Sequence, residues 1–325
     1  MDEKYIQFII AIPYILIALM LFPLVYMCLH IVYSKSTWHI HFKIFFFVFG
    51  FFLCCRAADN IALGLLYVLE VFVENNTTVG LNNITFFDVA QEYFVTYRAA
   101  VNNAVKTTMM VITAERVVAT NKRQIYENYK NIYLCAFIVI LIFGGCYLIM
   151  EIQYIPNFTQ PVYNIVLVCL DIPFPILFFF AFKKNVQLKC SENNDSKLSE
   201  RYQINENVVL LNRVSSLVII MIGMQIPLNI VNLYNSFDPY KTYPFISFMI
   251  YFGIRDLSSC IGLTMFYFNK PFSYFYQKLT KQKHTQIITV KPVISSSGKL
   301  KIILHHKKAV IKESDAYFEM LKRNW

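Results

Sequence analysis

Charged residues are scarce in this sequence. Asp, Glu, Lys and Arg make up only 15% of its 325 residues, whereas soluble domains usually carry about a quarter. Hydrophobic residues account for 57%, and the mean hydropathy is +0.46. This balance excludes an ordinary soluble domain and predicts a membrane protein. The net charge of +10 does not indicate nucleic-acid binding, because the basic residues are spread between apolar runs too long for a soluble fold.

Catalytic and cofactor motifs are also missing. The sequence contains no Gly-rich phosphate loop, no nucleophile elbow and no HExxH. His39 and His41 have no Cys or acidic residue nearby, so we expect interfacial loop residues rather than metal ligands. None of the eight cysteines falls in a predicted extracellular loop, which argues against an external disulfide framework. The sequence therefore predicts neither an enzyme nor a bound cofactor.

What the sequence does contain is seven apolar segments, each near the roughly 20 residues that cross a bilayer. They cover residues 6–33, 44–73, 91–120, 132–152, 163–182, 214–234 and 244–268. The expected fold is an all-α bundle of seven transmembrane helices within residues 1–285. An amphipathic helix on the anionic inner leaflet is expected at 269–283, which makes membrane lipid a partner. A basic cytoplasmic tail is expected at 286–325.

The distribution of basic residues predicts the orientation. One set of alternate connections holds nearly all of them, and the opposite side holds only Lys4 and Lys241. Because basic loops stay in the cytoplasm, the N-terminus is expected outside and the C-terminus inside. Four glycosylation sequons fall on the predicted outer side, at Asn75, Asn76, Asn83 and Asn157.

The segment 91–120 carries a polar stripe. Its members fall within roughly 80° of arc at about 100° per residue, and they are Arg98, Asn102, Lys106, Thr113 and Arg116. Hydrocarbon solvates neither charges nor amides, so this helix is expected at the centre of the bundle. Lys106 lies about 15 Å along the helix from Arg116, near mid-membrane. One end of the stripe suits a ligand pocket and the other a cytoplasmic switch.

Other intramembrane charges need partners. Arg56 and Asp59 share one face of the second segment, so they either compensate each other or join a polar network behind the third helix. Asp171 in the fifth segment needs a cation, which we expect on the third or seventh helix. The two ion pairs to test first are Asp256 with Lys106 and Arg255 with Asp171.

These charges have two interpretations, as buried structural pairs or as parts of a ligand pocket. The residues concerned are Arg98, Asn102, Lys106, Asp171, Arg255, Asp256, Arg56 and Asp59. A cationic pocket would favour an acidic or carbonyl-bearing small molecule. The alternative is a seven-span ion channel or transporter that uses these charges as a path. Against it, the sequence shows no internal repeat, and an odd number of spans does not divide into equal halves.

The polar stretch from Leu198 looks like a helix that runs unbroken into the sixth segment, and it faces the base of the third helix. It is either a charged cytoplasmic helix or a contact surface for an intracellular partner. Two sequence blocks are similar to those of a known family. One lies at the end of the third segment and just beyond it, and consists of Ala114-Glu115-Arg116 with Ala119-Thr120 and Tyr126-Glu127. The other opens the helix from Leu198 and consists of Leu198-Ser199-Glu200-Arg201-Tyr202-Gln203 with Glu206-Asn207.

With seven helices, these blocks resemble the nematode serpentine chemoreceptors, in particular the Sre class of the Sra superfamily. The resemblance implies a G-protein-coupled receptor in the plasma membrane of sensory neuron cilia that detects small environmental molecules, as in olfaction. It implies a heterotrimeric G protein as the intracellular partner, with homo- or hetero-oligomers left open. The residues implied in coupling are Glu115, Arg116, Arg201, Tyr202, Gln203, Glu206 and Asn207.

Overall fold

A computed structural model describes residues 3–35, 38–76, 86–122, 126, 131–152, 160–190, 198–236 and 244–268. All of them belong to one compact unit, Met1–Lys281. Within these ranges all the regular structure is helical. The helix expected at 269–283 and the tail expected at 286–325 lie outside the described residues.

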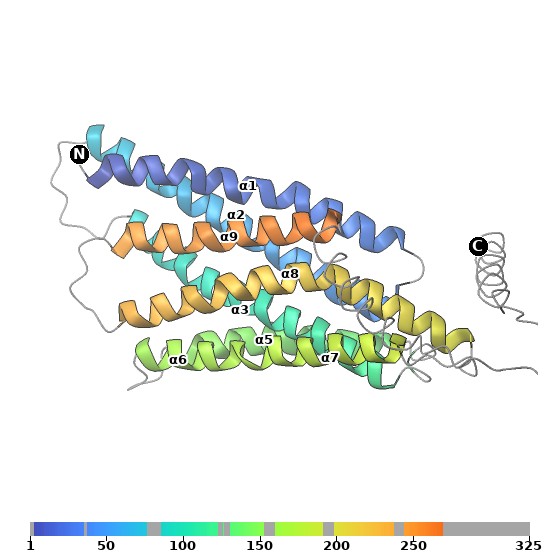
Figure 1. The fold of residues 1–325 in the computed structure, drawn as a ribbon. Coiled ribbons are helices and arrows are strands. Elements are labelled where there is room, and N and C mark those ends of the chain that lie inside the picture. Colours follow the sequence, from blue (N-terminus) through green and yellow to red (C-terminus); the bar gives the residue numbers. More distant parts are fainter. Residues whose placement is uncertain are drawn as a thin grey trace, which may run out of the picture. The chain divides into compact units, whose positions relative to one another are not determined.

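Over the described residues the helices form seven consecutive segments, in agreement with the all-α bundle predicted from the sequence (Figure 1). They are α1 (Glu3–Ser34), α2 (Ile40–Asn76), α3 (Phe86–Asn121), α5 (Ile132–Ile152), α6 (Gln160–Asp171), α7 (Pro173–Cys190), α8 (Leu198–Ser236) and α9 (Pro244–Phe268). The pair α6 and α7 makes up one segment. As expected, α8 begins at Leu198 and continues without a break through the sixth apolar segment.

The fifth segment differs from the single helix expected at 163–182. It divides at Ile172, which separates α6 from α7. Proline has no backbone N–H to donate and disfavours the helical conformation of the residue before it, so Pro173 ends one helix and begins the next. The break places Asp171 at the last position of α6, where it is only 6% exposed.

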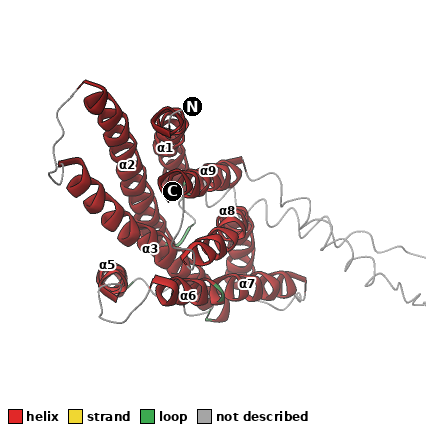
Figure 2. Ribbon diagram, turned by 90° about the vertical axis from the view of Figure 1, so that its left-hand side faces the viewer, coloured by secondary structure: helices red, strands yellow, loops and turns green. Residues whose placement is uncertain are grey.

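α3 lies inside the bundle, where its polar stripe requires it to be. It contacts α2, α5, α7 and α8, while α1 packs against α2 and α9, and α8 packs against α6, α7 and α9. Figure 2, viewed nearly along the helices, shows α3 between α2 and the α6–α8 group. Its position allows one helix to connect a site in the middle of the bundle with a site at its end.

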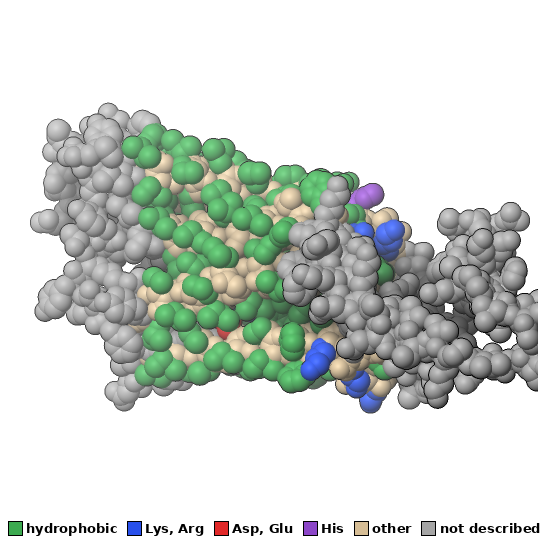
Figure 3. All heavy atoms as spheres, in the orientation of Figure 1, with side chains coloured by type: hydrophobic (Ala, Val, Ile, Leu, Met, Phe, Trp, Pro, Cys, Tyr) green, Lys and Arg blue, Asp and Glu red, His purple; other side chains and the backbone are tan. Residues whose placement is uncertain are grey.

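The surface of the bundle is apolar around its middle and basic at one end (Figure 3). Large hydrophobic side chains are widely exposed, such as Tyr133 at 89% and Ile140 at 67%, as expected of helices that face lipid rather than water. Three stretches are long and apolar enough to cross a membrane, Phe8–Ser34, Ile40–Leu69 and Asn207–Val231. A shorter apolar helix covers Ile132–Leu148.

We call the end where α1, α3 and α7 finish and α2, α5 and α8 begin the basic end. Four exposed lysines lie there, Lys35, Lys122, Lys183 and Lys184. Towards the same end a buried aromatic group fills the space between α2 and α9, with the rings of Phe46 and Phe266 stacked at 4.9 Å. This packing holds together α2 and α9, the two helices that also carry several buried charged residues.

Candidate functional site

The polar stripe of α3 is buried along its length, as predicted. Arg98, Asn102, Thr113 and Arg116 are each at most 5% exposed, and the Lys106 side chain is 12% exposed. The stripe contacts the other helices through three polar clusters. One surrounds Arg98, one surrounds Lys106 and one surrounds Arg116.

The first cluster joins α2 to α3 and α9. Arg98 Nε donates to Asp59 Oδ2 at 2.8 Å, and both side chains are fully buried. The Arg98 guanidinium also lies 4.5 Å from the centre of the Phe252 ring. Arg56 Nε lies 2.8 Å from Asp256 Oδ1, so each acid of this cluster faces a cation on another helix.

Amide and hydroxyl groups complete the first cluster. Asn60 donates to Asp256, Tyr14 of α1 donates to Asn60 at 2.8 Å, and Arg56 donates to Ser259 at 2.7 Å. Four helices therefore share one network. Because every charge in it has an oppositely charged partner on another helix, loss of one side chain would leave a buried charge uncompensated, so the network ties the packing of α1, α2, α3 and α9 together.

Of the two interpretations of Arg56 and Asp59, the structure has the polar network with the third helix, and the predicted pair of Asp256 with Lys106 is wrong. Arg56 does not compensate Asp59, although the two lie three residues apart, and Asp256 does not pair with Lys106. Their positions on α2 place Arg56 beside α9 and Asp59 beside α3. Ion pairs between helices then replace the pair within one helix.

The second cluster lies where α6 ends. Lys106 Nζ donates to Asp171 Oδ2 at 3.1 Å, which confirms the expected cation on the third helix. Asn229 of α8 donates to the same carboxylate oxygen. The predicted pair of Arg255 with Asp171 is wrong, because Arg255 instead donates to Asn229 Oδ1 at 3.3 Å.

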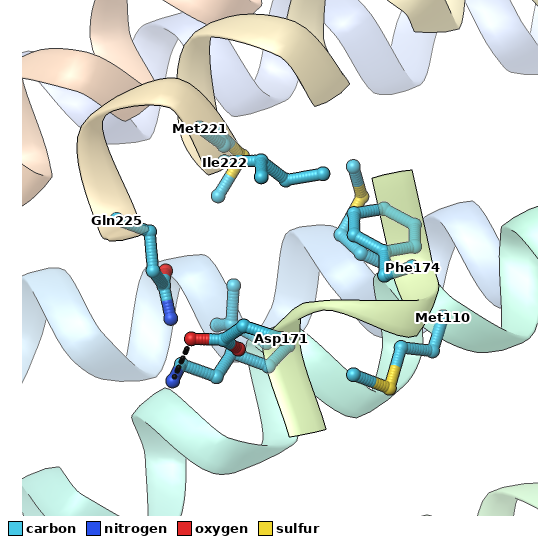
Figure 4. A pocket seen from close by; sticks show the side chains of 9 residues that line it. Met110, Asp171, Phe174, Met221, Ile222 and Gln225 are labelled. Atoms are coloured by element: carbon cyan, nitrogen blue, oxygen red, sulfur yellow. Dashed lines mark hydrogen bonds and ion pairs between the residues drawn. The ribbon is translucent and has the colours of Figure 1, made fainter. Parts of the chain in front are cut away.

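A cavity opens beside the Lys106–Asp171 pair (Figure 4). Together with its open mouth, the space measures about 390 Å³. Apart from Lys106, Asp171 and Gln225, its walls are apolar, formed by Val105, Met109, Met110, Phe174, Met221 and Ile222. Figure 4 shows Gln225 and Asp171 close together at one end of the space and Phe174 and Met110 at the other, with the dashed line marking the ion pair. The site thus combines an apolar interior with a few polar groups, as ligand pockets do.

Gln225 connects the cavity to Arg255. With its amide oxygen turned toward the two cations, Gln225 accepts from Lys106 Nζ at 2.6 Å and from Arg255 at 3.0 Å. Arg255 also lies 5.1 Å from the centre of the Tyr251 ring, and Tyr251 donates to Asn229 at 2.8 Å. One neutral oxygen therefore faces two buried cations.

The third cluster lies at the basic end. Arg116 pairs with its neighbour Glu115 and donates to Asn207 of α8 at 2.9 Å and to Tyr126 at 3.1 Å. Tyr126 donates to Glu115, and its ring lies 4.1 Å from that of His39. Arg116 is 1% exposed, so it is held inside the bundle by α3, α8 and the chain between α3 and α5.

Comparison with known proteins decides the family. The model of the Sre G protein-coupled chemoreceptor family matches residues 4–325, nearly the whole chain. The chain belongs to the Sre family. This is a receptor family and not an enzyme family. No curated protein matches the chain.

In this Sre receptor the remaining predicted coupling residues lie along the first turns of α8. Arg201, Tyr202, Gln203 and Glu206 precede Asn207 on that helix, and their side chains lie outside the described part of the chain. Two hydrogen bonds join α7 to α3 nearby, from Asn185 to Thr120 and from Lys184 to Asn121. Of the predicted glycosylation sites, Asn75 and Asn76 end α2 with side chains that are not described, and Asn83 and Asn157 lie outside the described residues.

Sequence reasoning missed several residues of the Sre receptor's site. They are Tyr14, Asn60, Gln225, Asn229 and Tyr251, all neutral and polar. The signal was present, because an amide in an apolar span is costly unless it bonds another helix.

Proposed function

We propose that this chain is a chemosensory receptor that binds a small environmental molecule in the cavity beside Lys106 and signals to a heterotrimeric G protein at the basic end. One observation carries the proposal. The cavity and the buried Arg116 cluster lie on the same stripe of α3, about 15 Å apart along the helix. A small shift or rotation of α3 would change both sites together.

In the resting state, Arg116 is held by Glu115 and linked to α8 through Asn207. Ligand binding favours a second packing in which α3 and α8 separate at the basic end. The coupling surface that then opens consists of Glu115, Arg116, Arg201, Tyr202, Gln203, Glu206 and Asn207. The Asn207 bond supports this mechanism, because it joins the switch arginine to the helix that carries the other coupling residues.

The ligand is a small molecule with an acidic or carbonyl group. Lys106 and Gln225 supply polar anchors, while Met109, Met110 and Met221 supply a deformable apolar wall. The enclosed part of the cavity is narrow, with room for only a few water-sized groups. A larger ligand therefore binds by displacing methionine side chains. Arg98, Asn102, Asp59, Arg56 and Asp256 support the pocket from behind.

The receptor spans the plasma membrane of sensory neuron cilia, with the N-terminus outside and the basic end in the cytoplasm. The exposed lysines of that end support this orientation. Glycans on Asn75, Asn76, Asn83 and Asn157 would then be extracellular. Residues 1–285 form the receptor domain, residues 269–283 lie on the inner leaflet, and 286–325 form the tail. Homo- or hetero-oligomers are compatible with this arrangement.

Calcium or cAMP imaging in cells that express the receptor tests the proposal, with a panel of small volatile and acidic molecules. Arg116→Ala should abolish the response while surface labelling stays intact. Lys122→Ala is the matched control, because Lys122 is an exposed cation near the same end of α3. A ligand-evoked current that persists with G proteins blocked would contradict the proposal.

A further inference from the structure

Among the described residues away from the basic end, Arg255 is the buried cation that forms no ion pair with an acid. Away from the basic end, the described spans bury four cations, Arg56, Arg98, Lys106 and Arg255, and three acids, Asp59, Asp171 and Asp256. Each of the three acids forms an ion pair with one of the other three cations, so Arg255 is not part of any of these pairs. The carboxylate of Asp256, its neighbour in sequence, is engaged by Arg56 and Asn60 of α2.

Among the described residues, the Arg255 side chain forms its hydrogen bonds and ring contacts with neutral groups, and the adjacent Asp256 acts on it through space. It is 6% exposed, it shares the oxygens of Asn229 and Gln225, and it lies beside the rings of Tyr251 and Phe252. Its Nε has no hydrogen-bond partner among the described residues. An arginine stays charged in proteins, and a buried charge without a counter-ion is costly. The position therefore calls for an anion.

The cavity supplies the place for that anion. Gln225 lines the cavity and puts a single neutral oxygen between Arg255 and Lys106. A carboxylate that displaces this amide would offer two oxygens and a full negative charge to the same two donors. Arginine binds carboxylates well because its planar fork matches their geometry. The remaining walls are apolar, which suits an organic acid rather than an inorganic ion.

We infer that the ligand is a small monocarboxylate whose charged group binds between Arg255 and Lys106 and whose apolar body lies among the methionines of the cavity. Arg255 thus determines specificity for the charged group. The inference rests on the proposed ligand pocket and selects the acidic class over the carbonyl class.

Thermal unfolding of the purified full-length receptor tests the charge imbalance without a ligand. Arg255→Gln should raise the unfolding midpoint by about 2–4 °C, because it removes an uncompensated charge. Arg56→Gln is the matched control and should lower the midpoint, because it leaves Asp256 with one partner fewer. Equal destabilisation by the two variants would show that Arg255 is already compensated, and would overturn the inference.

The ligand class is tested on the same material with butanoate and hexanoate, each compared with its primary alcohol and with equal sodium chloride. The acids should raise the midpoint of the wild-type receptor more than the alcohols or chloride, and Arg255→Gln should weaken the apparent affinity by about 10- to 100-fold. The assignment of a carboxylate ligand would be contradicted if neither acid raises the unfolding midpoint more than its alcohol does, or if chloride raises it as much as the acids. This assay involves no G protein, so its failure and a failure of signalling are separate results.

Discussion

Asp171 Oδ2 lies 3.1 Å from Lys106 Nζ, and Asp171 is the last residue of α6. Ile172, the next residue, separates α6 from α7. The ion pair therefore joins the central helix to a discontinuity in its neighbour. The cavity that Asp171 borders is thus bounded on one side by a helix break rather than by a continuous helix.

Breaking this pair from one side should destabilise the receptor. Lys106→Met leaves Asp171 buried with only Asn229, and the cost of an uncompensated buried charge is about 3–5 kcal/mol. The double variant Lys106→Met with Asp171→Leu should recover most of that loss but not ligand binding. A thiol-reactive dye can follow unfolding, because Cys28, Cys135, Cys146 and Cys260 are buried free thiols. A double variant no more stable than Lys106→Met would contradict the pairing.

The pair of Arg98 with Asp59 makes a second prediction. Exchanging the two residues, Arg98→Asp with Asp59→Arg, should restore part of the stability that either single change removes. We expect a coupling energy of about 1–3 kcal/mol in a double-mutant cycle measured by thermal unfolding. The matched cycle between Asp59 and Arg56, which share a helix but no ion pair, should give less coupling. A larger coupling energy between Asp59 and Arg56 than between Asp59 and Arg98 would contradict the observed network.

The Asn207 bond to Arg116 should restrain basal signalling. Asn207→Ala removes the acceptor on α8, so the active packing becomes more populated. A bond to a charged group is worth about 1.5–3 kcal/mol, which predicts a clear rise in ligand-independent cAMP or calcium signal. Asn212→Ala is the control, because Asn212 is buried on the same helix and its Oδ1 has no hydrogen-bond partner among the described residues. Equal ligand-independent signals from Asn207→Ala and Asn212→Ala would contradict the idea that the Asn207 bond to Arg116 restrains signalling.

Gly64 allows α1 and α2 to approach closely. A Cβ atom at this position would lie 2.6 Å from Ile15 Cγ1, so Gly64→Ala should lower the free energy of unfolding by about 1–3 kcal/mol. Gly223→Ala is the control, because a Cβ at Gly223 would meet nothing within 4 Å. That variant should leave the unfolding midpoint unchanged or raise it. Loss of stability in both would point to a general intolerance of larger residues.

Much of the fold follows from hydrophobic run length and from the basic residues. The buried position of the α3 stripe could also be predicted, because a charge such as Lys106 cannot face lipid. The ion-pair partners could not, because they depend on how each helix is rotated and how far it is shifted along its axis. Arg56 and Asp59 illustrate this, since a spacing of three residues favours a pair within the helix and the neighbouring helices offered closer partners.

The sequence has Pro173 and Pro175 just after Asp171, but it does not show that the helix ends at Asp171. A proline in a transmembrane segment is compatible with a kink or with a complete break, and neighbouring helices decide between them. The bridging role of Gln225 was equally hidden. It depends on two cations from different helices meeting at one amide.

Nucleotide exchange on a panel of Gα subunits by the purified receptor in lipid nanodiscs would show whether Arg116 is a switch. Wild type, Asn207→Ala and Arg116→Ala are compared without a ligand. We expect Asn207→Ala to raise the exchange rate of at least one Gα subunit above wild type, and Arg116→Ala to lower it to the rate without receptor. Exchange rates that are the same for all three proteins on every Gα subunit would contradict a switch at Arg116.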